Sequence, residues 1–537
     1  MKFLRILLSA AGIALLAGPC ASSPGLPVRG WLIHTPDKAY INRVLKAAPS
    51  YGINHLDMSH NFVDNIDEIL ERPGLAELVE QTALRARKLG IKSYVWSHEL
   101  NTRNRDIVLN PGTPDGKAFW ESRKNAYRQA LKRCPSLSGV VLMFGSCPTE
   151  VWDRRITDPY WNGLTWPARV RFVTGVVQSV VSKEMGRSLW VRDFIHSPVQ
   201  LQALVDGLRN FPGITVYSKS EPQDFQLFYP HSFSIGAYGR TPQVFELDIN
   251  GEYWGQSAIP VSLVKYLRYR IGYGVRKGIS GAVARIDTYE NRALGTPSEI
   301  NLYAFSRLME NPSLSEQAIY DGWLLKRYGL HPKSTAAVKL QRILARTLDV
   351  VRTTYYTQGF WAPKSQSSMP DSMGDIQGSL LGKSTAIWDT AARPTQERLS
   401  HPDSKTVAKI LAEKSVGIEL ADKNCRELAS LKSSLKPADY QDLNRRLALT
   451  SQIARLYRSI SFAYWNARLV QEGRAPDGWK EILTSAGDNL IRWAYDIEAG
   501  KVALPQNINE ARALRLFAAE VHKVDVPRTE VGTTNSN

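Results

Sequence analysis

The sequence predicts an α/β protein in which a (β/α)8 TIM barrel is followed by a C-terminal all-α helical domain. Three observations predict this fold. Short apolar segments alternate with longer segments of helical periodicity from residue 28 onward, as in repeated strand–helix units. The first such strand is followed by His34, Thr35 and Pro36, whereas an open doubly wound sheet would place a Gly-rich phosphate loop there. Beyond about residue 315 only helical periods remain.

The expected strands are short and largely apolar, which is typical of parallel strands buried between helices. They cover residues 29–33, 53–58, 91–96, 139–144, 188–194, 213–217, 243–247 and 281–286. The segments between them carry apolar residues three or four positions apart, which predicts amphipathic helices. These helices cover residues 39–51, 74–89, 117–134, 167–185, 199–209, 259–274 and 297–310.

The rest of the chain predicts a helical bundle. Helical periods cover residues 315–328, 334–355, 403–431, 437–471, 478–499 and 508–521. Residues 359–383 are rich in Ser, Met, Pro and Gly and predict a loop, and residues 525–537 predict a polar, frayed tail. We therefore expect a catalytic barrel at residues 25–330 and a helical domain at residues 331–537, which also offers a surface for a homodimer.

The first 24 residues predict a bacterial secretory signal peptide. Lys2 and Arg5 precede an apolar core at residues 7–16, and small residues follow it. The apolar run is too short for a typical membrane span. Cys20 is a candidate for lipid attachment, so the membrane contact considered is a lipid anchor at that residue. We expect an exported protein that is periplasmic, secreted or anchored to the outer membrane.

Composition narrows the classes of partner. The 537 residues are 43% hydrophobic and 22% charged, as in a soluble globular protein, and the net charge of +17 fits an acidic polysaccharide. No run of Lys and Arg is interleaved with aromatic residues, so we do not expect nucleic acid as a partner. Cys134, Cys147 and Cys425 form neither a disulfide framework nor a zinc spacing. No metal and no organic cofactor is expected.

Polar and aromatic residues follow the predicted strands, where a barrel carries its chemistry. Sugar sites combine aromatic rings, on which sugars stack, with polar groups that bind hydroxyls. Alternatives remain open, because strand-end carboxylates also cap helices, rim aromatics also pack, and His34, His60 and His98 could bind a metal ion. The predicted substrate-binding residues are Trp31, His34, His60, Asn61, Trp96, His98, Arg192, Asp193, Tyr253, Trp254, Asp287 and Tyr289.

A set of ordered motifs resembles the α-glucuronidases of glycoside hydrolase family sixty-seven. Residues 224–226 (DFQ) and 252–256 (EYWGQ) resemble that family's "DFQ" and "EY-x-GQ" elements. Further similar segments are residues 51–54 (YGIN), 190–194 (WVRDF), 301–305 (NLYAF), 311–312 (NP) and 314–315 (LS). The resemblance covers roughly residues 29–329. It departs from the family in Asp193, where the family has a small residue, and in lacking the family's N-terminal β-domain.

The resemblance implies the catalytic residues. Asp224 and Glu252 match the family's two carboxylates on the water side, and Glu150 is the carboxylate available after the fourth strand, where the family has its acid. Protonated Glu150 would protonate the leaving oxygen, while Glu252, with Asp224 as partner or alternate base, would activate water on the opposite ring face. Inversion requires about 6.5–9.5 Å between acid and base.

The expected activity is therefore that of an O-glycosyl hydrolase. We expect an exo-acting, inverting, α-glucuronidase-like enzyme whose substrate is a plant or algal oligosaccharide or polysaccharide, acidic or neutral. Two other interpretations stay open. The chain could be a non-catalytic glycan-binding protein on the same barrel, or a polysaccharide lyase with Tyr253 or a His as its base.

Overall fold

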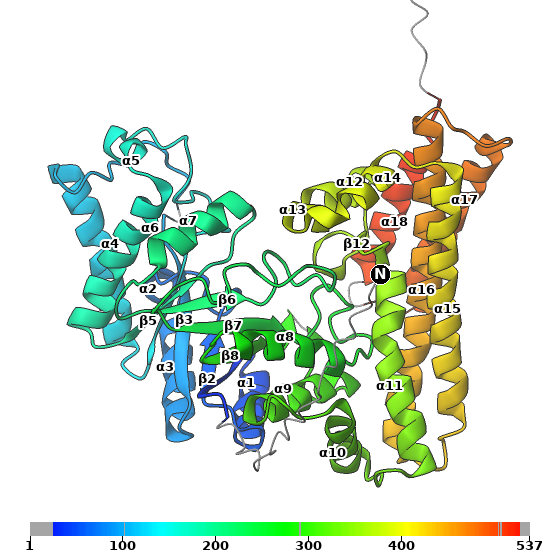
Figure 1. Cartoon of the computed structure of the whole chain (residues 1–537), viewed down its shortest axis with the longest axis horizontal. Coiled ribbons are helices and arrows are strands. Elements are labelled where there is room, and N and C mark those ends of the chain that lie inside the picture. Colours follow the sequence, from blue (N-terminus) through cyan, green and yellow to red (C-terminus); the bar gives the residue numbers. More distant parts are fainter. Residues whose placement is uncertain (1–24, 101, 289–290, 503, 505–506, 527–537) are drawn as a thin grey trace, which may run out of the picture.

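The computed structural model describes residues 25–100, 102–288, 291–502, 504 and 507–526. The predicted signal peptide with Cys20, and the predicted sugar contact Tyr289, lie outside the described residues. Eight parallel strands close a barrel in sequence order, which confirms the predicted fold class (Figure 1). The strands are β1 (Val28–Ile33), β2 (His55–Met58), β3 (Lys92–His98), β4 (Gly139–Met143), β5 (Ser188–Arg192), β6 (Thr215–Lys219), β7 (Gln243–Asp248) and β8 (Gly281–Arg285).

Helices surround the barrel. Several begin at a Ser or Thr that caps the first turn and is followed within two residues by Pro, as at Thr113, Thr165 and Ser197. The helices are α1 (Lys38–Ala47), α2 (Glu68–Glu71), α3 (Leu75–Lys88), α4 (Pro114–Arg133), α5 (Pro159–Gly163), α6 (Trp166–Gln178), α7 (Pro198–Leu208), α8 (Val264–Arg276) and α9 (Ile300–Glu310). A π-helical turn, Ser179–Glu184, extends α6, and a short hairpin of β9 (Asp287–Thr288) and β10 (Asn291–Arg292) follows β8.

The barrel interior changes from apolar to charged along the strands. Side chains alternate faces in a strand, so residues two apart share the interior. Trp190, Tyr217 and Val283 belong to the apolar cluster that fills the barrel. Two residues further along each strand stand Arg192, Lys219 and Arg285, each the last residue of its strand. The carboxyl ends of the strands therefore carry a layer of charged side chains above an apolar plug.

The C-terminal region is helical, as predicted. Long helices lie side by side and make extensive contacts with their neighbours, most of all α15 with α16 and α17 with α18 (Figure 1). The helices are α10 (Glu316–Tyr328), α11 (Thr335–Thr354), α12 (Met373–Gly382), α13 (Thr385–Trp388), α14 (Arg393–Ser400), α15 (Ser404–Ala429), α16 (Pro437–Gln471), α17 (Trp479–Glu498) and α18 (Asn507–Val521). In the described part of the chain, no helix combines the length and the apolarity that a bilayer crossing needs.

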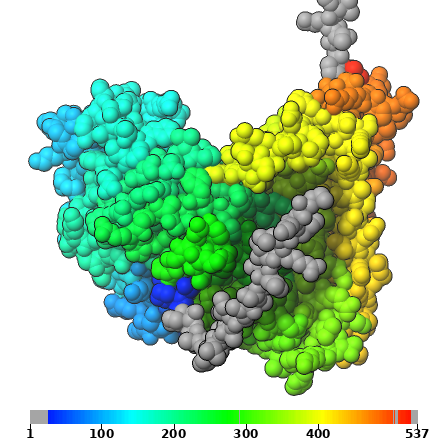
Figure 2. Space-filling view, viewed as in Figure 1, coloured from blue at the N-terminus to red at the C-terminus, as the bar shows by residue number. Residues whose placement is uncertain are grey.

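The prediction of a loop over residues 359–383 was wrong in part. This segment holds α12, which Ser372 caps, and part of a two-stranded hairpin of β11 (Tyr356–Thr357) and β12 (Phe360–Trp361). Three glycines in α12 hide its helical pattern, because Gly is a poor helix former. Figure 1 shows α12 and α13 extending from the helical bundle toward the barrel, and Figure 2 shows a notch in the surface between them and the α5–α7 side of the barrel.

Candidate active site

A pocket of about 310 Å³ lies at the carboxyl ends of the barrel strands. The final residues of five strands line it, which is the usual position of the active site in a TIM barrel. Two lining residues, Gln366 and Lys383, come from the helical region. The full lining is His60, Asp64, His98, Met143, Ser146, Arg192, Phe194, His196, Lys219, Asp224, Glu252, Tyr253, Arg285, Gln366 and Lys383.

The turn after β7 positions Glu252. The Asp248 carboxylate, at the end of β7, accepts hydrogen bonds from the backbone N–H of Asn250 and of Gly251 at 2.9 Å and of Glu252 at 2.6 Å. Burial raises the pKa of Asp248 to about 6, although Arg285 opposes the shift. Gly251 has a φ of +103°, and a Cβ there would lie 2.3 Å from Trp254. Both features fix the turn, so Asp248 positions Glu252 without lining the pocket itself.

The carboxylate of Glu252 forms an ion pair with Arg285. Its Oε2 accepts a hydrogen bond of 2.6 Å from Arg285 at the end of β8. Burial disfavours the charged guanidinium, but Glu252 and Asp248 outweigh this effect and raise the pKa of Arg285. Ser367 of the helical region donates a 2.7 Å hydrogen bond to the backbone oxygen of Glu252. The Glu252 carboxylate is therefore held in place from the barrel and from the helical region.

Asp224 has two ammonium groups as partners. Lys383 donates to its Oδ2 at 2.8 Å, and Lys219 lies 3.6 Å from its Oδ1. Burial alone would favour the neutral acid, but Lys383 and Lys219 outweigh burial and hold the pKa of Asp224 far below its usual range. Lys383 also donates to the Tyr253 hydroxyl at 3.2 Å. Asp224 is therefore a carboxylate at neutral pH, which suits a base and not an acid.

Further cations form the floor of the pocket. Arg192 makes two hydrogen bonds to Glu246, of 2.5 and 2.9 Å, and its guanidinium lies 4.6 Å from the centre of the Trp96 ring. The Lys219 ammonium lies between the rings of Phe194 and Phe225, at 3.9 and 4.1 Å from their centres. Burial lowers the pKa of Lys219 to about 8, although Asp224 opposes the shift.

Two histidines bring ring nitrogens to the pocket. His98 Nδ1 lies 2.8 Å from the backbone oxygen of Asp64, and because a carbonyl oxygen only accepts, Nδ1 is the donor. In the neutral ring Nε2 is then an acceptor, and it is buried with no protein partner among the described residues. Burial and the charges of Arg285 and Arg192 hold the pKa of His60 well below its usual range. Nε2 of His98 is suited to accept a hydrogen bond from a sugar hydroxyl.

Glu150 lies at the edge of the pocket and outside its lining. Its carboxylate accepts a 2.9 Å hydrogen bond from the backbone N–H of Ser146, which does line the pocket, and a second from the indole of Trp152. Burial lowers the pKa of His196, a lining residue, while Asp224 and Glu150 oppose this shift. Both carboxylates therefore lie close enough to His196 to affect its charge, which places Glu150 on the same rim as Asp224.

Four of the predicted sugar contacts line the pocket, namely His60, His98, Arg192 and Tyr253. Trp31 is fully buried in the layer between the barrel and its helices, so it cannot stack on a sugar. Trp254 is buried in the same core and packs against Tyr266. Trp96 lies inside the barrel beneath His60 and Arg192. The stacking roles predicted for these tryptophans are therefore wrong. Trp31 faces the surrounding helices, Trp254 is packed in the same core, and Trp96 lies one interior layer below the strand ends.

The other predicted contacts also serve the scaffold. Asp193 points away from the pocket and accepts hydrogen bonds from Ser218 at 2.6 Å and Tyr238 at 2.7 Å. Asp287 joins the β8 and β1 loops by accepting from the backbone of His34 at 2.8 Å and Thr35 at 3.3 Å, and burial raises its pKa to about 7. These are structural roles, and the predicted substrate roles of Asp193 and Asp287 are corrected accordingly.

The remaining two predictions concern the β1 and β2 loops. Asn61 is exposed and does not line the pocket. His34 is buried behind His60, with ring centres 4.2 Å apart in an edge-to-face contact. Among the described residues, no three or more His, Cys, Asp and Glu side chains are arranged to hold a metal ion, so the three-histidine metal site is not supported.

Several residues of the pocket were not predicted. Lys219 and Arg285 could have been found, because each is a cation at the end of an otherwise apolar strand, on the interior face. Lys383 and Gln366 carry no such signal, since they lie in a polar segment remote in sequence from the barrel. Their place at the site depends on how the helical region packs.

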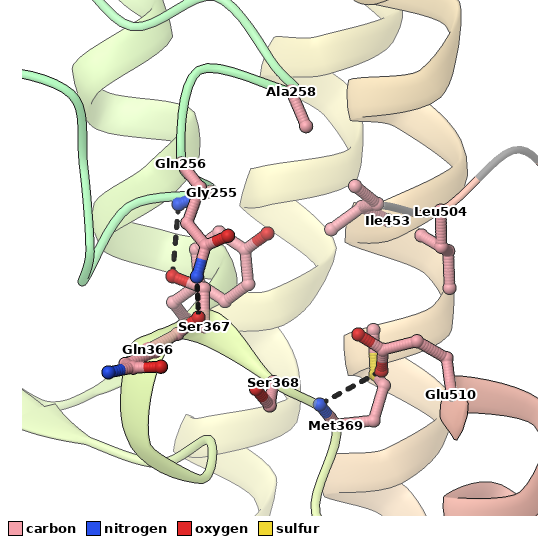
Figure 3. A pocket seen from close by; sticks show the side chains of 11 residues that line it. Gly255, Gln256, Ala258, Gln366, Ser367, Ser368, Met369, Ile453, Leu504 and Glu510 are labelled. Atoms are coloured by element: carbon pink, nitrogen blue, oxygen red, sulfur yellow. Dashed lines mark hydrogen bonds between the residues drawn. The ribbon is translucent and has the colours of Figure 1, made fainter. Parts of the chain in front are cut away.

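The helical region is fixed to the β7 turn by a second contact zone. Gly255 N–H donates to Ser367 at 3.1 Å, and the Gln256 side chain donates to the backbone oxygen of Gln366 (Figure 3). Beside this zone the Glu510 carboxylate accepts a 3.0 Å hydrogen bond from the Met369 N–H (Figure 3). Burial raises the pKa of Glu510 to about 7.

Comparisons with known proteins address the fold. No protein-family model matches the sequence, and no curated protein matches it. A solved glycoside hydrolase of family 138 that targets the pectin rhamnogalacturonan II has a TM-score of 0.62 and 12% identity, over 93% of this chain and 83% of that one. The chain has the fold of a TIM-barrel glycoside hydrolase.

Two further solved glycoside hydrolases are less similar. A family 115 4-O-methyl-α-glucuronidase with specificity for decorated arabinogalactans has a TM-score of 0.48 and 12% identity, over 96% of this chain and 64% of that one. An O-GlcNAc hydrolase variant of Thermobaculum terrenum has a TM-score of 0.44 and 11% identity, over 93% and 94%. The family 138 match supports a glycoside hydrolase fold and does not single out family sixty-seven.

Proposed function

We propose that the chain is a glycoside hydrolase that cleaves a plant glycan at the pocket described above. The observation that carries the proposal is that Asp224 and Glu252, each paired with a cation, line one pocket at the carboxyl ends of the strands. Such ion-paired carboxylates are suited to take a proton from water, and glycoside hydrolysis requires such a base.

The proposed reaction proceeds with inversion. Glu252, with Asp224 as partner, takes a proton from a water molecule whose oxygen bonds to the anomeric carbon. The bond between that carbon and the leaving oxygen breaks, and Glu150 gives its proton to the leaving oxygen. The position of Glu150 on the rim beside Ser146 supports this role. His98 and Arg192 are proposed to bind hydroxyls or a carboxylate of the sugar.

An acidic sugar at the end of a chain is the proposed substrate. The pocket lining holds four cations, Arg192, Lys219, Arg285 and Lys383, and three carboxylates, Asp64, Asp224 and Glu252. With Glu246, which pairs with Arg192 at the pocket floor, the charges balance, so the proposal of an acidic sugar rests on the guanidinium and ammonium donors that line the pocket and suit a carboxylate. Such a ligand fits an exo-acting, α-glucuronidase-like activity. The family 138 neighbour targets a pectin, so pectic oligosaccharides are the first substrates to test.

The identity of the acid can be tested with two variants. Glu150→Gln should lower kcat about 10²–10⁴-fold on the best substrate of a pectic and xylan oligosaccharide panel, because a general acid contributes about this much. Glu77→Gln, at an exposed glutamate on α3, is the control and should remain active, and Asp64→Asn removes the other carboxylate at the pocket edge. Product anomers followed by NMR should show inversion. Loss of activity in Asp64→Asn alone would transfer the acid role to Asp64, and ultraviolet-absorbing unsaturated products would indicate a lyase.

Export is proposed separately, on the first 24 residues of the sequence. The full chain expressed in a Gram-negative host should appear in the periplasmic or membrane fraction with a shortened N-terminus. Cys20→Ser distinguishes the two routes, since it should release the protein from membranes only when Cys20 carries a lipid. Full-length protein confined to the cytoplasm would contradict export.

A further inference from the structure

An apolar groove lies on the same end of the barrel as the pocket. It has a volume of about 650 Å³ and is lined by Trp166, Pro167, Pro198, Val199, Gln202, Ala203, Asp206 and Phe233. Helices α6 and α7 begin at Trp166 and Pro198, directly after the loops that follow β4 and β5. The groove therefore lies on the catalytic face. Val199 is 67% exposed and Phe233 is 44% exposed, which is unusual for large apolar side chains.

One end of the groove connects to the rim of the pocket through Trp152. The indole of Trp152 donates to Glu150, and its ring lies 6.5 Å from the half-buried ring of Trp166 in the groove. The guanidinium of the exposed Arg154 lies 5.8 Å from the centre of the Trp166 ring. A ring in this part of the groove would thus meet an aromatic face and a charged hydrogen-bond donor together.

The other end connects to the pocket through Trp388 of the helical region. Phe233 lies 6.5 Å from the half-buried Trp388 ring, and the Trp388 indole donates to Gln223 at 3.1 Å. The Gln223 side chain also lies 3.4 Å from His196, which lines the pocket. The loop after β5 also places the two sites next to each other, since the exposed His196 lines the pocket and Pro198, two residues further on, lines the groove.

We propose that this groove binds further sugar residues of the same glycan chain whose terminal residue enters the pocket, with Trp166 and Phe233 as stacking platforms. The inference rests on the proposed hydrolase function and adds that the substrate is a chain and not a disaccharide. A pyranose ring has an apolar face and a hydroxyl edge. The groove offers both kinds of partner, since Gln202 and Asp206, joined by a 2.9 Å hydrogen bond, and Arg154 border the aromatic surface.

The kinetic test compares substrate lengths. Phe233→Ala should lower kcat/KM about 5-fold on an octasaccharide fraction of hydrolysed pectin, which corresponds to about 1 kcal/mol for stacking on one aromatic ring. It should leave kcat/KM on the disaccharide fraction within about twofold of wild type, because the disaccharide does not reach the groove. Phe233→Tyr should restore most of the loss. Tyr495→Ala, at a ring 58% exposed on α17, is the matched control and should change neither value. Equal effects on both lengths, or none, would overturn the proposal.

A binding test separates this proposal from the failure of the proposed function. Native gels that contain soluble pectin measure retardation without any turnover. Wild type should be retarded, and the double variant Phe233→Ala/Trp166→Leu, which keeps the pocket and the net charge, should be retarded less, with circular dichroism confirming that it is folded. Equal retardation of both proteins would overturn the groove as a glycan site, even if the wild type hydrolyses the panel. Weaker retardation of the variant would support the groove even if no substrate were cleaved.

Discussion

Asp224 shows how single residues set the chemistry of this site. Lys383 and Lys219 stabilise its charged form against the cost of burial. The ion pair with Arg285 holds the Glu252 carboxylate in place. The sequence motifs predicted both carboxylates but not these partners. The motifs pointed to the two carboxylates, whereas the cations that pair with them come from neighbouring strands and from a remote segment.

Removal of the Lys383 charge should change the pH dependence of turnover. Lys383 lowers the pKa of Asp224, so Lys383→Gln should raise that pKa. If the ionised carboxylate is the active form, the acid limb of the kcat/KM profile should then move to higher pH. Lys364→Gln is the matched control, because Lys364 pairs with Asp371 outside the pocket. A limb at the same pH in wild type and in Lys383→Gln would contradict this role of Lys383.

The elements of the barrel were predictable because their patterns are strong. Strands such as β4 are continuous apolar runs, and helices such as α3 carry an apolar face, so both were expected within a few residues of their bounds. Helix α12 was missed, since its glycines weaken the pattern and its packing against α18 and β12 compensates. Helix α12 directly precedes Lys383, which lines the pocket.

At the level of elements, α18 should make the stability of the protein depend on pH. The pKa of Glu510 is about 7 in the folded protein and 4.5 as its ordinary value. The folded state therefore holds a proton between pH 4.5 and 7 that the unfolded state has lost. The contribution of Glu510 to stability is present below pH 4.5 and is lost as pH rises through 7, by at most about 3 kcal/mol.

Glu510→Gln tests this linkage, because the amide can still accept the Met369 hydrogen bond and does not titrate. The melting temperature of wild type minus that of Glu510→Gln, measured by calorimetry, should fall between pH 5 and pH 7. A difference that stays constant or rises over this range would contradict the assignment of a raised pKa to Glu510.

In the whole molecule, the helical region completes the candidate site. Gln366 and Lys383 line the pocket, and Ser367 holds the backbone at Glu252, so the barrel alone does not contain the site described above. The sequence predicted a helical region after the barrel, but not that this region contributes residues to the pocket. Packing between segments more than 100 residues apart produces no periodic pattern in the sequence. Only the pocket residues that lie on the barrel could therefore be predicted from the sequence.

Ser367→Ala measures the contribution of the helical region to catalysis. The variant loses two hydrogen bonds, one to the Glu252 oxygen and one from Gly255. It should lower kcat by at most about 30-fold with little change in KM, since each bond contributes about 1 kcal/mol. Ser313→Ala, at an exposed serine, is the matched control. A kcat equal to that of wild type would show that the turn at Glu252 needs no support from the helical region.

The activity of Glu252→Gln on the best substrate of the glycan panel tests the central claim most directly. We expect kcat to fall at least about 10²-fold, with binding retained, because the amide has the shape of the carboxylate but cannot take a proton from water. Glu77→Gln, at an exposed glutamate on α3, should be as active as wild type. Turnover by Glu252→Gln at the wild-type rate would contradict the account.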